Sequence, residues 1–150
     1  MDLFEELVLW HLTRKGDVFV CPQYEIDGGW SCPDFVALNP KKKTVSVVEV
    51  SAASSPNGLL KKVRERENQW FGKLRAQLLK LGIIDNSWGP FQAELYVRDT
   101  VAKQMRTKFN EEDIMIKSLE EIGFPWKWDW PSKKAAKEAE EMKSGLENQV

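Results

Sequence analysis

Two β-rich segments, residues 30–38 and 44–51, flank a short stretch that contains Asn-Pro and three lysines. Such a stretch between β-branched segments is typical of a turn, so the two segments are predicted to pair as a β-hairpin. Each segment contains one carboxylate among apolar residues, Asp34 in the first and Glu49 in the second. The valines on both sides of Glu49 indicate a strand that is largely buried. The hairpin therefore brings two carboxylates together in an apolar environment.

Two carboxylates that approach each other repel unless a cation lies between them. Carboxylate oxygens with room for water are the ligands that Mg²⁺ prefers, and bound Mg²⁺ is typical of phosphate chemistry. The pair thus predicts a metal site. The alternative is that Asp34, which follows Pro33, is a turn residue and that Glu49 faces solvent. In that case neither carboxylate has a catalytic role.

Helix and strand patterns alternate along most of the chain. The first helix has an apolar face and ends at Gly16, and its His11 is predicted to be a packed, hydrogen-bonded core residue. The predicted elements are a helix at 2–15, strands at 17–26, 30–38 and 44–51, a helix at about 59–81, a strand at 91–98, a helix capped by Asp99 or Thr100 that runs to about Phe109, and a short strand at 114–116.

Over about residues 2–110, this order of Pro-Asp, hairpin and buried acid resembles the PD-(D/E)XK nuclease superfamily, which includes restriction endonucleases and archaeal Holliday-junction resolvases. The resemblance implies an α/β fold with a restriction endonuclease-like αβββαβ core, in which helices flank a mixed central sheet. It also implies a metal-dependent endonuclease that hydrolyses phosphodiester bonds in DNA. Mg²⁺ or Mn²⁺ would be held by Asp34, Glu49 and the backbone carbonyl of Val50.

The chain departs from the family pattern at position 51, where the family has its catalytic lysine and this chain has Ser51. A short neutral hydroxyl could only hydrogen-bond a metal-bound water, so a cation is expected from elsewhere. Lys61 and Lys62 begin the next helix, and Lys62 is favoured. Glu5 in the first helix is expected to hold a metal-bound water, and Glu25 is a further candidate that depends on its strand register.

Basic residues gather in the predicted long helix. Residues 61–80 contain seven bases and two acids, whereas residues 1–40 contain two bases and seven acids. A basic helix beside an acidic site is suited to holding a phosphate backbone near a metal. The polar stripe predicted to contact DNA consists of Lys62, Arg66, Gln69 and Lys73. The alternative is a solvated helix face.

At 150 residues the chain is expected to form one domain, residues 1–130, followed by a charged C-terminal helix or disordered tail at 131–150. Trp126, Trp128 and Trp130 are predicted to clamp onto the domain surface or a dimer partner, or else to stack on unpaired bases. No segment is apolar enough to span a membrane and no signal peptide is recognisable, so a cytoplasmic location without a membrane partner is expected. Cys21 and Cys32 are expected to be reduced.

Three functions remain open from the sequence. The first is a metal-dependent deoxyribonuclease, for which a homodimer would supply two sites because duplex cleavage acts on both strands. The second is a catalytically impaired protein of the nuclease fold that binds nucleic acid without cutting it, since Ser51 replaces lysine. The third is a structural or interaction protein in which the two acids have no chemical role.

Overall fold

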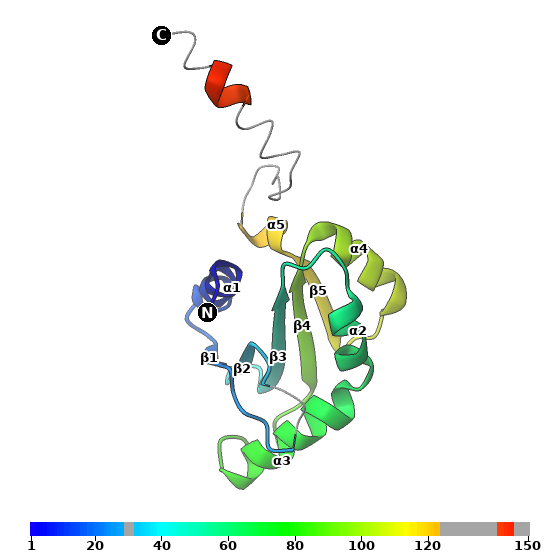
Figure 1. Ribbon diagram of the computed structural model, residues 1–150. Helices are drawn as coiled ribbons and strands as arrows, with labels where there is room; N and C mark the ends of the chain where they lie inside the picture. Colours follow the sequence, from blue (N-terminus) through cyan, green and yellow to red (C-terminus); the bar gives the residue numbers. More distant parts are fainter. Residues whose placement is uncertain (29–31, 124–140, 146–150) are drawn as a thin grey trace.

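A five-stranded mixed sheet forms the centre of the computed structural model, which describes residues 1–28, 32–123 and 141–145 (Figure 1). The strands lie in chain order, β1-β2-β3-β4-β5. The first three pair antiparallel, and the β3–β4 and β4–β5 pairs are parallel. The prediction of an α/β fold with a mixed sheet flanked by helices is confirmed. The strands are β1 (Phe19–Pro22), β2 (Phe35–Asn39), β3 (Thr44–Ser51), β4 (Phe91–Val97) and β5 (Ile114–Ser118).

Helices cover both faces of the sheet, as Figure 1 shows. One face packs against α2, α3 and α4, and the other against α1 and α5. A short π-helical segment, η1, joins the α2 region to α3. The bounds are α1 (Leu3–Thr13), α2 (Asn57–Arg64), η1 (Glu67–Phe71), α3 (Gly72–Lys80), α4 (Asp99–Lys108) and α5 (Leu119–Gly123).

Alternation along β3 divides the core between the two faces. Val45 and Val47 pack with α3, whereas Val48 packs with Val8 of α1 on the opposite face. Both faces of β3 are buried because this strand lies in the middle of the sheet with helices on each side. The continuous valine pattern predicted this environment for Glu49, which is 5% exposed.

The prediction of one continuous helix at 59–81 is wrong. It is interrupted at Glu65 and continues through the π-helical η1. The two parts pack in different clusters: Val63 of α2 lies with α4, whereas Leu74 of α3 lies with β2 and β3. A π-helical segment adds a residue to the turn and rotates the helix on its C-terminal side. This local change lets each part direct its apolar side to its own cluster.

Other predicted boundaries were also corrected by the structure. The strand predicted at 17–26 is regular only over Phe19–Pro22, because Gln23 adopts a left-handed conformation with φ of 49°. The helix predicted to be capped by Asp99 or Thr100 has Arg98 at its cap and no side-chain cap hydrogen bond. Instead, the Asp99 N–H donates to Glu120 Oε2 at 2.7 Å, a partner supplied by α5.

Within the described ranges, no helix combines the length and apolar character needed to cross a membrane. Residues 141–145 are helical and exposed. Two predicted features lie outside the described residues. They are the three tryptophans at 126, 128 and 130, and the tail predicted at 131–150 apart from residues 141–145.

Candidate active site

The hairpin ends where the two carboxylates meet. The last β2–β3 pair is Phe35 with Val48. Continuing this register places Asp34 opposite Glu49 and Pro33 opposite Val50. Residues opposite each other on antiparallel strands have Cβ atoms about 5 Å apart. The antiparallel register therefore places the two acids side by side.

Pro33 explains why the backbone ladder stops at this point. A proline has no N–H, so it cannot donate to the carbonyl of Val50. The Val50 N–H is satisfied by a side chain instead, donating to Asp34 Oδ2 at 2.7 Å. The N–H and carbonyl of one strand residue point toward the same neighbouring strand. The Val50 carbonyl therefore points toward the segment that contains Pro33 and Asp34. Pro33 has no N–H that could donate a hydrogen bond to this carbonyl.

Asp34 and Glu49 approach each other at the end of the hairpin. Glu49 is on the side of Val47, because side chains alternate along β3, whereas Asp34 precedes β2 and lines a cavity with Phe35 and Glu5 on the α1 side. The charge of Asp34 raises the pKa of Glu49, so the two carboxyl groups lie close together. Val36 and Val47 belong to one buried cluster, on the face covered by α3.

Burial is the main reason that both carboxylates are hard to ionise. Burial first, and then the charge of Asp34, raise the pKa of Glu49 to about 8, while Lys62 opposes the rise. The pKa of Asp34 is also raised, by burial and by Glu5, against the opposing hydrogen bond from Val50 N–H. Glu49 Oε1 is buried and has no hydrogen-bond partner among the described residues. The two carboxylates would therefore be stabilised in their ionised forms by additional positive charge.

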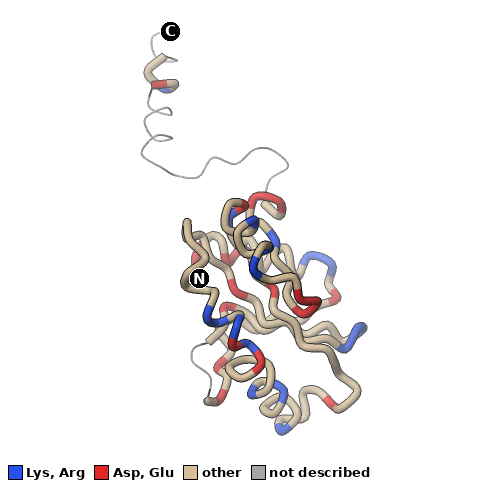
Figure 2. The backbone as a smooth tube through the Cα atoms, turned by 90° about the vertical axis from the view of Figure 1, so that its right-hand side faces the viewer, with Lys and Arg blue, Asp and Glu red and all other residues tan. Residues whose placement is uncertain are grey.

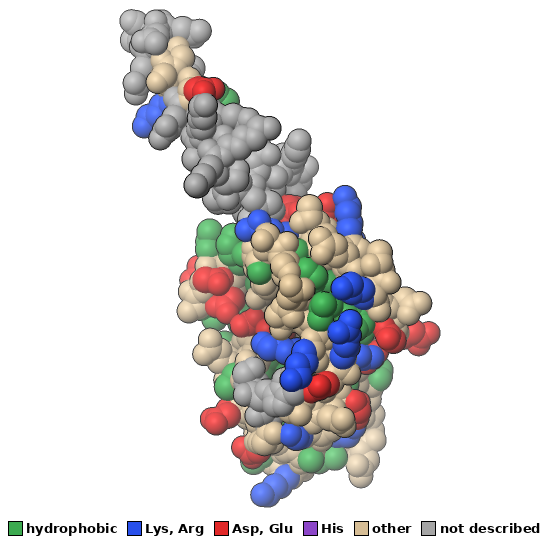
Figure 3. Space-filling view, turned by 45° about the vertical axis from the view of Figure 1, so that its right-hand side comes forward, with side chains coloured by type: hydrophobic (Ala, Val, Ile, Leu, Met, Phe, Trp, Pro, Cys, Tyr) green, Lys and Arg blue, Asp and Glu red, His purple; other side chains and the backbone are tan. Residues whose placement is uncertain are grey.

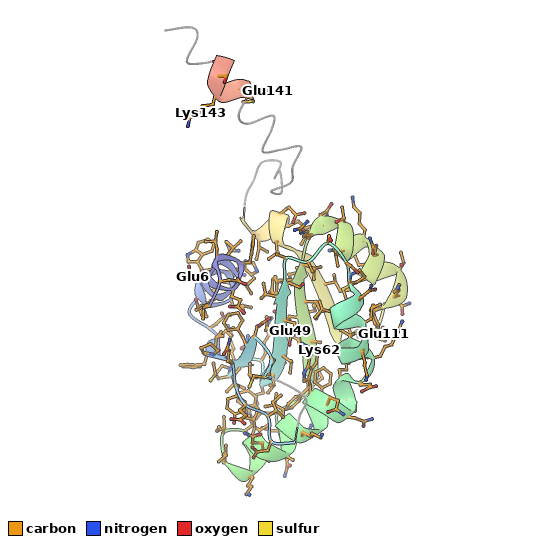
Figure 4. All side chains as sticks on the ribbon, in the orientation of Figure 1. Glu6, Glu49, Lys62, Glu111, Glu141 and Lys143 are labelled. Atoms are coloured by element: carbon orange, nitrogen blue, oxygen red, sulfur yellow. The ribbon has the colours of Figure 1, made fainter. Side chains whose placement is uncertain are left out.

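Lys62 is the cation closest to this pair in the described contacts. Its Nζ lies 3.7 Å from Glu49 Oε1, and the Lys62 and Glu49 side chains are 31% and 7% exposed. Figure 4 shows the two side chains approaching each other from α2 and β3. Leu59 and Val63 are buried, which anchors α2 on the sheet and leaves Lys62 at its margin. An ammonium group thus stands beside the carboxylates although position 51 has none.

Glu5 approaches the site from α1. Its Oε2 accepts the Asp2 N–H at 2.9 Å and Asp2 Oδ1 accepts the Glu5 N–H at 2.8 Å, which is a capping box. Glu5 and Asp34 line one cavity of about 220 Å³ together with Gln23 and Phe35. The structure therefore brings the predicted Glu5 close enough to Asp34 to raise its pKa.

Ser51 and Glu25 differ in their relation to the site. By alternation Ser51 lies on the same face as Glu49, and its Oγ accepts the Ala53 N–H at 3.3 Å. Glu25 is exposed and follows β1, and its backbone carbonyl accepts from Gln77 Nε2 of α3 at 3.0 Å. Glu25 lies outside β1, so no strand register directs its side chain toward the site.

The predicted DNA-contacting stripe is divided by the fold. Arg66 is held by Asp113, with Nε to Oδ2 at 2.6 Å and Nη2 to Oδ1 at 3.0 Å. Lys73 donates to the Gly28 carbonyl and, at 3.5 Å, to Gln69 Oε1. Of the four predicted residues, only Lys62 is paired with a carboxylate of the site. Asp113 was missed in the sequence because nothing local relates it to a residue 47 positions away.

A divalent cation at this end of the hairpin would have a small donor set. In the part of the chain that the structure describes, no group of three or more His, Cys, Asp or Glu side chains is arranged to hold a metal. The available oxygens are those of Asp34 and Glu49 and the Val50 carbonyl. Hard oxygen donors fit Mg²⁺ or Mn²⁺, and Mg²⁺ commonly uses one or two carboxylates and keeps several waters. The chemistry of this donor set therefore fits such an ion.

No family model, curated protein or solved structure matches this chain.

Proposed function

We propose that this chain is a metal-dependent deoxyribonuclease of the PD-(D/E)XK type, with a restriction endonuclease-like core. The observation that supports the proposal most is the Asp34–Glu49 pair at the end of the hairpin, with the Lys62 ammonium 3.7 Å from Glu49. Two neighbouring carboxylates with a cation beside them are suited to phosphodiester hydrolysis.

Asp34, Glu49 and the Val50 carbonyl would hold Mg²⁺ or Mn²⁺. When bound, the ion would neutralise phosphate charge and lower the pKa of a coordinated water. Lys62 would stabilise the negative charge that develops on the phosphate and orient the attacking water. Glu5 would accept a hydrogen bond from a water in the neighbouring cavity. Ser51 would accept a hydrogen bond from a water on the face of β3 that carries Glu49.

DNA is the proposed substrate, and we propose that it binds to the basic side of the molecule. Figure 3 shows Lys and Arg side chains gathered across the middle of one face, with acidic side chains at its margins. In the α2–α3 region bases are interspersed with the acids Glu65 and Glu67. Figure 2 shows basic and acidic residues mixed along the backbone. Lys62 is the proposed contact nearest the scissile phosphate. Arg66, Gln69 and Lys73 would contact the backbone only by exchanging their present partners. A homodimer would supply a second site for the other strand.

The second candidate is a nuclease-fold protein that binds nucleic acid without cutting it. The Lys62–Glu49 ion pair favours it, because the ammonium partly neutralises the buried acid without any metal. In this case Lys62 would be a structural counter-ion rather than a catalytic group.

Cleavage assays separate these candidates. Supercoiled, linear and branched DNA are incubated with the protein and Mg²⁺ or Mn²⁺, beside Asp34→Ala, Glu49→Ala and the control Lys80→Ala, an exposed lysine at the end of α3. We expect cleavage by wild type and Lys80→Ala and none by the two carboxylate variants. Equal cleavage by all four proteins would refute the assignment. Binding of DNA and metal without cleavage would establish the second candidate.

A further inference from the structure

A second cavity, of about 370 Å³, lies on the α1 face of the sheet beside the C-terminal end of α1. Its floor includes Ser46 of β3 and Gln92 and Glu94 of β4. At the other end of this face Val48 and Tyr96 are covered by α1 and α5. The apolar end is closed by helices, and the polar end remains a concave surface.

The polar side chains of the floor hold one another in place. Gln92 Nε2 donates to Ser46 Oγ at 2.8 Å and to Glu94 Oε1 at 3.3 Å. The hydroxyl of the fully buried Tyr96 donates to Glu94 Oε2 at 2.9 Å. Ser46 is itself only 5% exposed. Such a connected network orients its members before any ligand arrives. Alternating polar residues in both strands were the sequence signal that could have predicted it.

His11 adds an unsatisfied group to this cavity. Its ring lies edge-on to Tyr96, with the centroids 5.9 Å apart, and its Nδ1 is buried without a hydrogen-bond partner among the described residues. The predicted packing of His11 is therefore observed, but the predicted hydrogen bond is not found at Nδ1. Nearly all buried polar atoms in proteins have a partner. Because His11 lines the cavity, its ring would sense a ligand bound there.

The cavity lining has an excess of positive charge. Two acids and four basic side chains line it, the acids being Asp17 and Glu94 and the bases Arg14, Lys15, Lys42 and Lys117. The bases come from the end of α1, the β2–β3 turn and β5, which are distant in the sequence. Arginine and lysine at a concave site are suited to phosphate oxygens.

We propose that this cavity binds a small phosphate-bearing organic molecule of about nucleotide size. Its volume is within the range of about 300–1,000 Å³ usual for such sites. The basic residues would hold the phosphate, and Gln92, Glu94 and Ser46 would pair with hydroxyl or amino groups of the remainder. The site is on the face opposite Glu49 and is independent of the proposed nuclease activity.

The chain contains one histidine, so its imidazole signals in an NMR spectrum need no assignment. We would titrate the full chain with ADP, and separately with inorganic phosphate and with adenosine, while following the His11 ring. The same titrations on Lys42→Ala/Lys117→Ala test the basic residues. Lys80→Ala on the opposite side of the sheet is the matched lysine control, and Asp34→Ala tests independence from the nuclease site.

We expect a saturable shift of the His11 signals with ADP and a weaker one with phosphate. The double lysine variant should bind ADP at least about tenfold more weakly, and Lys80→Ala and Asp34→Ala should bind as wild type does. The absence of a His11 shift with ADP would overturn the proposal. So would equal binding of adenosine and ADP, or an equal loss in Lys80→Ala.

Discussion

At the scale of single residues, Glu49 is the residue on which the site depends. It is a carboxylic acid at 5% exposure, opposite another acid and 3.7 Å from a lysine ammonium. Its raised pKa follows mainly from burial, since a low-dielectric environment disfavours the charged form. The same physics has a measurable consequence for stability and, under the proposed function, a second one for catalysis through Lys62.

The first prediction concerns pH and stability in the absence of metal. The pKa of Glu49 rises from an ordinary 4.5 to about 8 on folding. Between these values the folded state holds a proton that the unfolded state has released, so stability falls as pH rises. Glu49→Gln removes this penalty. We expect the variant to exceed wild type by about 1–3 kcal/mol near pH 9, with a smaller difference near pH 5. Denaturant unfolding with a chelator present measures it, and a difference that is independent of pH would contradict it.

The second prediction concerns the cation beside Glu49. If Lys62 stabilises the transition state, Lys62→Ala should reduce the cleavage rate by about 100-fold or more while metal affinity changes little. Adding Ser51→Lys should restore part of the rate, because it returns an ammonium to the same face of β3. Single-turnover cleavage and metal titration separate the two effects, with Lys80→Ala as the control. An unchanged rate in Lys62→Ala would remove Lys62 from the mechanism.

At the scale of elements, the hairpin and the interrupted helix determine where the polar groups lie. Pro33 ends the β2–β3 ladder and leaves Val50 to pair with the Asp34 side chain. The break at Glu65 separates Lys62 of α2 from Lys73 of α3, so residues on one predicted stripe reach different partners. Arg66, at the junction, connects the helical segment to the start of β5 through Asp113.

The third prediction is that Arg66 has a mainly structural role. Its guanidinium makes two hydrogen bonds to Asp113 and is 16% exposed. Arg66→Ala should cost about 1–3 kcal/mol of unfolding free energy, because Asp113 then loses its charged partner. A double-mutant cycle with Asp113→Ala should show a coupling of about 1 kcal/mol. Additive effects, together with weakened DNA binding in Arg66→Ala alone, would instead assign it to phosphate contact.

At the scale of the whole molecule, the site lies where the two helical layers meet the end of the hairpin. Glu5 comes from α1 on one face of the sheet, and Lys62 comes from α2 on the other (Figure 1). Asp34, Glu49 and Val50 lie between them at the end of the β2–β3 ladder. A ligand bound to these groups would link both layers, so its binding should stabilise the complete fold.

The fourth prediction is a consequence of this arrangement. Mn²⁺ or Mg²⁺ at about 100 times its Kd should stabilise wild type by about 2.7 kcal/mol. For a chain of this size the expected rise in Tm is about 5–10 °C. At one fixed metal concentration the rise should be larger near pH 8 than near pH 6, because the ion competes with the proton on Glu49. Calorimetry with Asp34→Ala as the matched variant tests this. An equal rise in both proteins would show that the ion binds elsewhere.

Local sequence patterns determined the hairpin, the buried strand at Thr44–Ser51 and the α/β class. They succeeded because a turn signal and a run of β-branched residues act over a few residues. The hairpin's turn also limits the register, which is why two acids in separate segments could be predicted as neighbours. Helix ends were less well predicted, since Asp99 uses a partner from α5 rather than a local cap.

Only the tertiary structure decided which groups surround the two acids. The Lys62–Glu49 ion pair, the Arg66–Asp113 pair and the polar floor around Glu94 each join residues from separate elements. Their partners are selected by how helices pack on the sheet, and a π-helical turn is enough to send neighbouring basic residues in different directions. Charge and spacing in the sequence are equally compatible with several such pairings, because the packing free energy that chooses among them is distributed over the whole core.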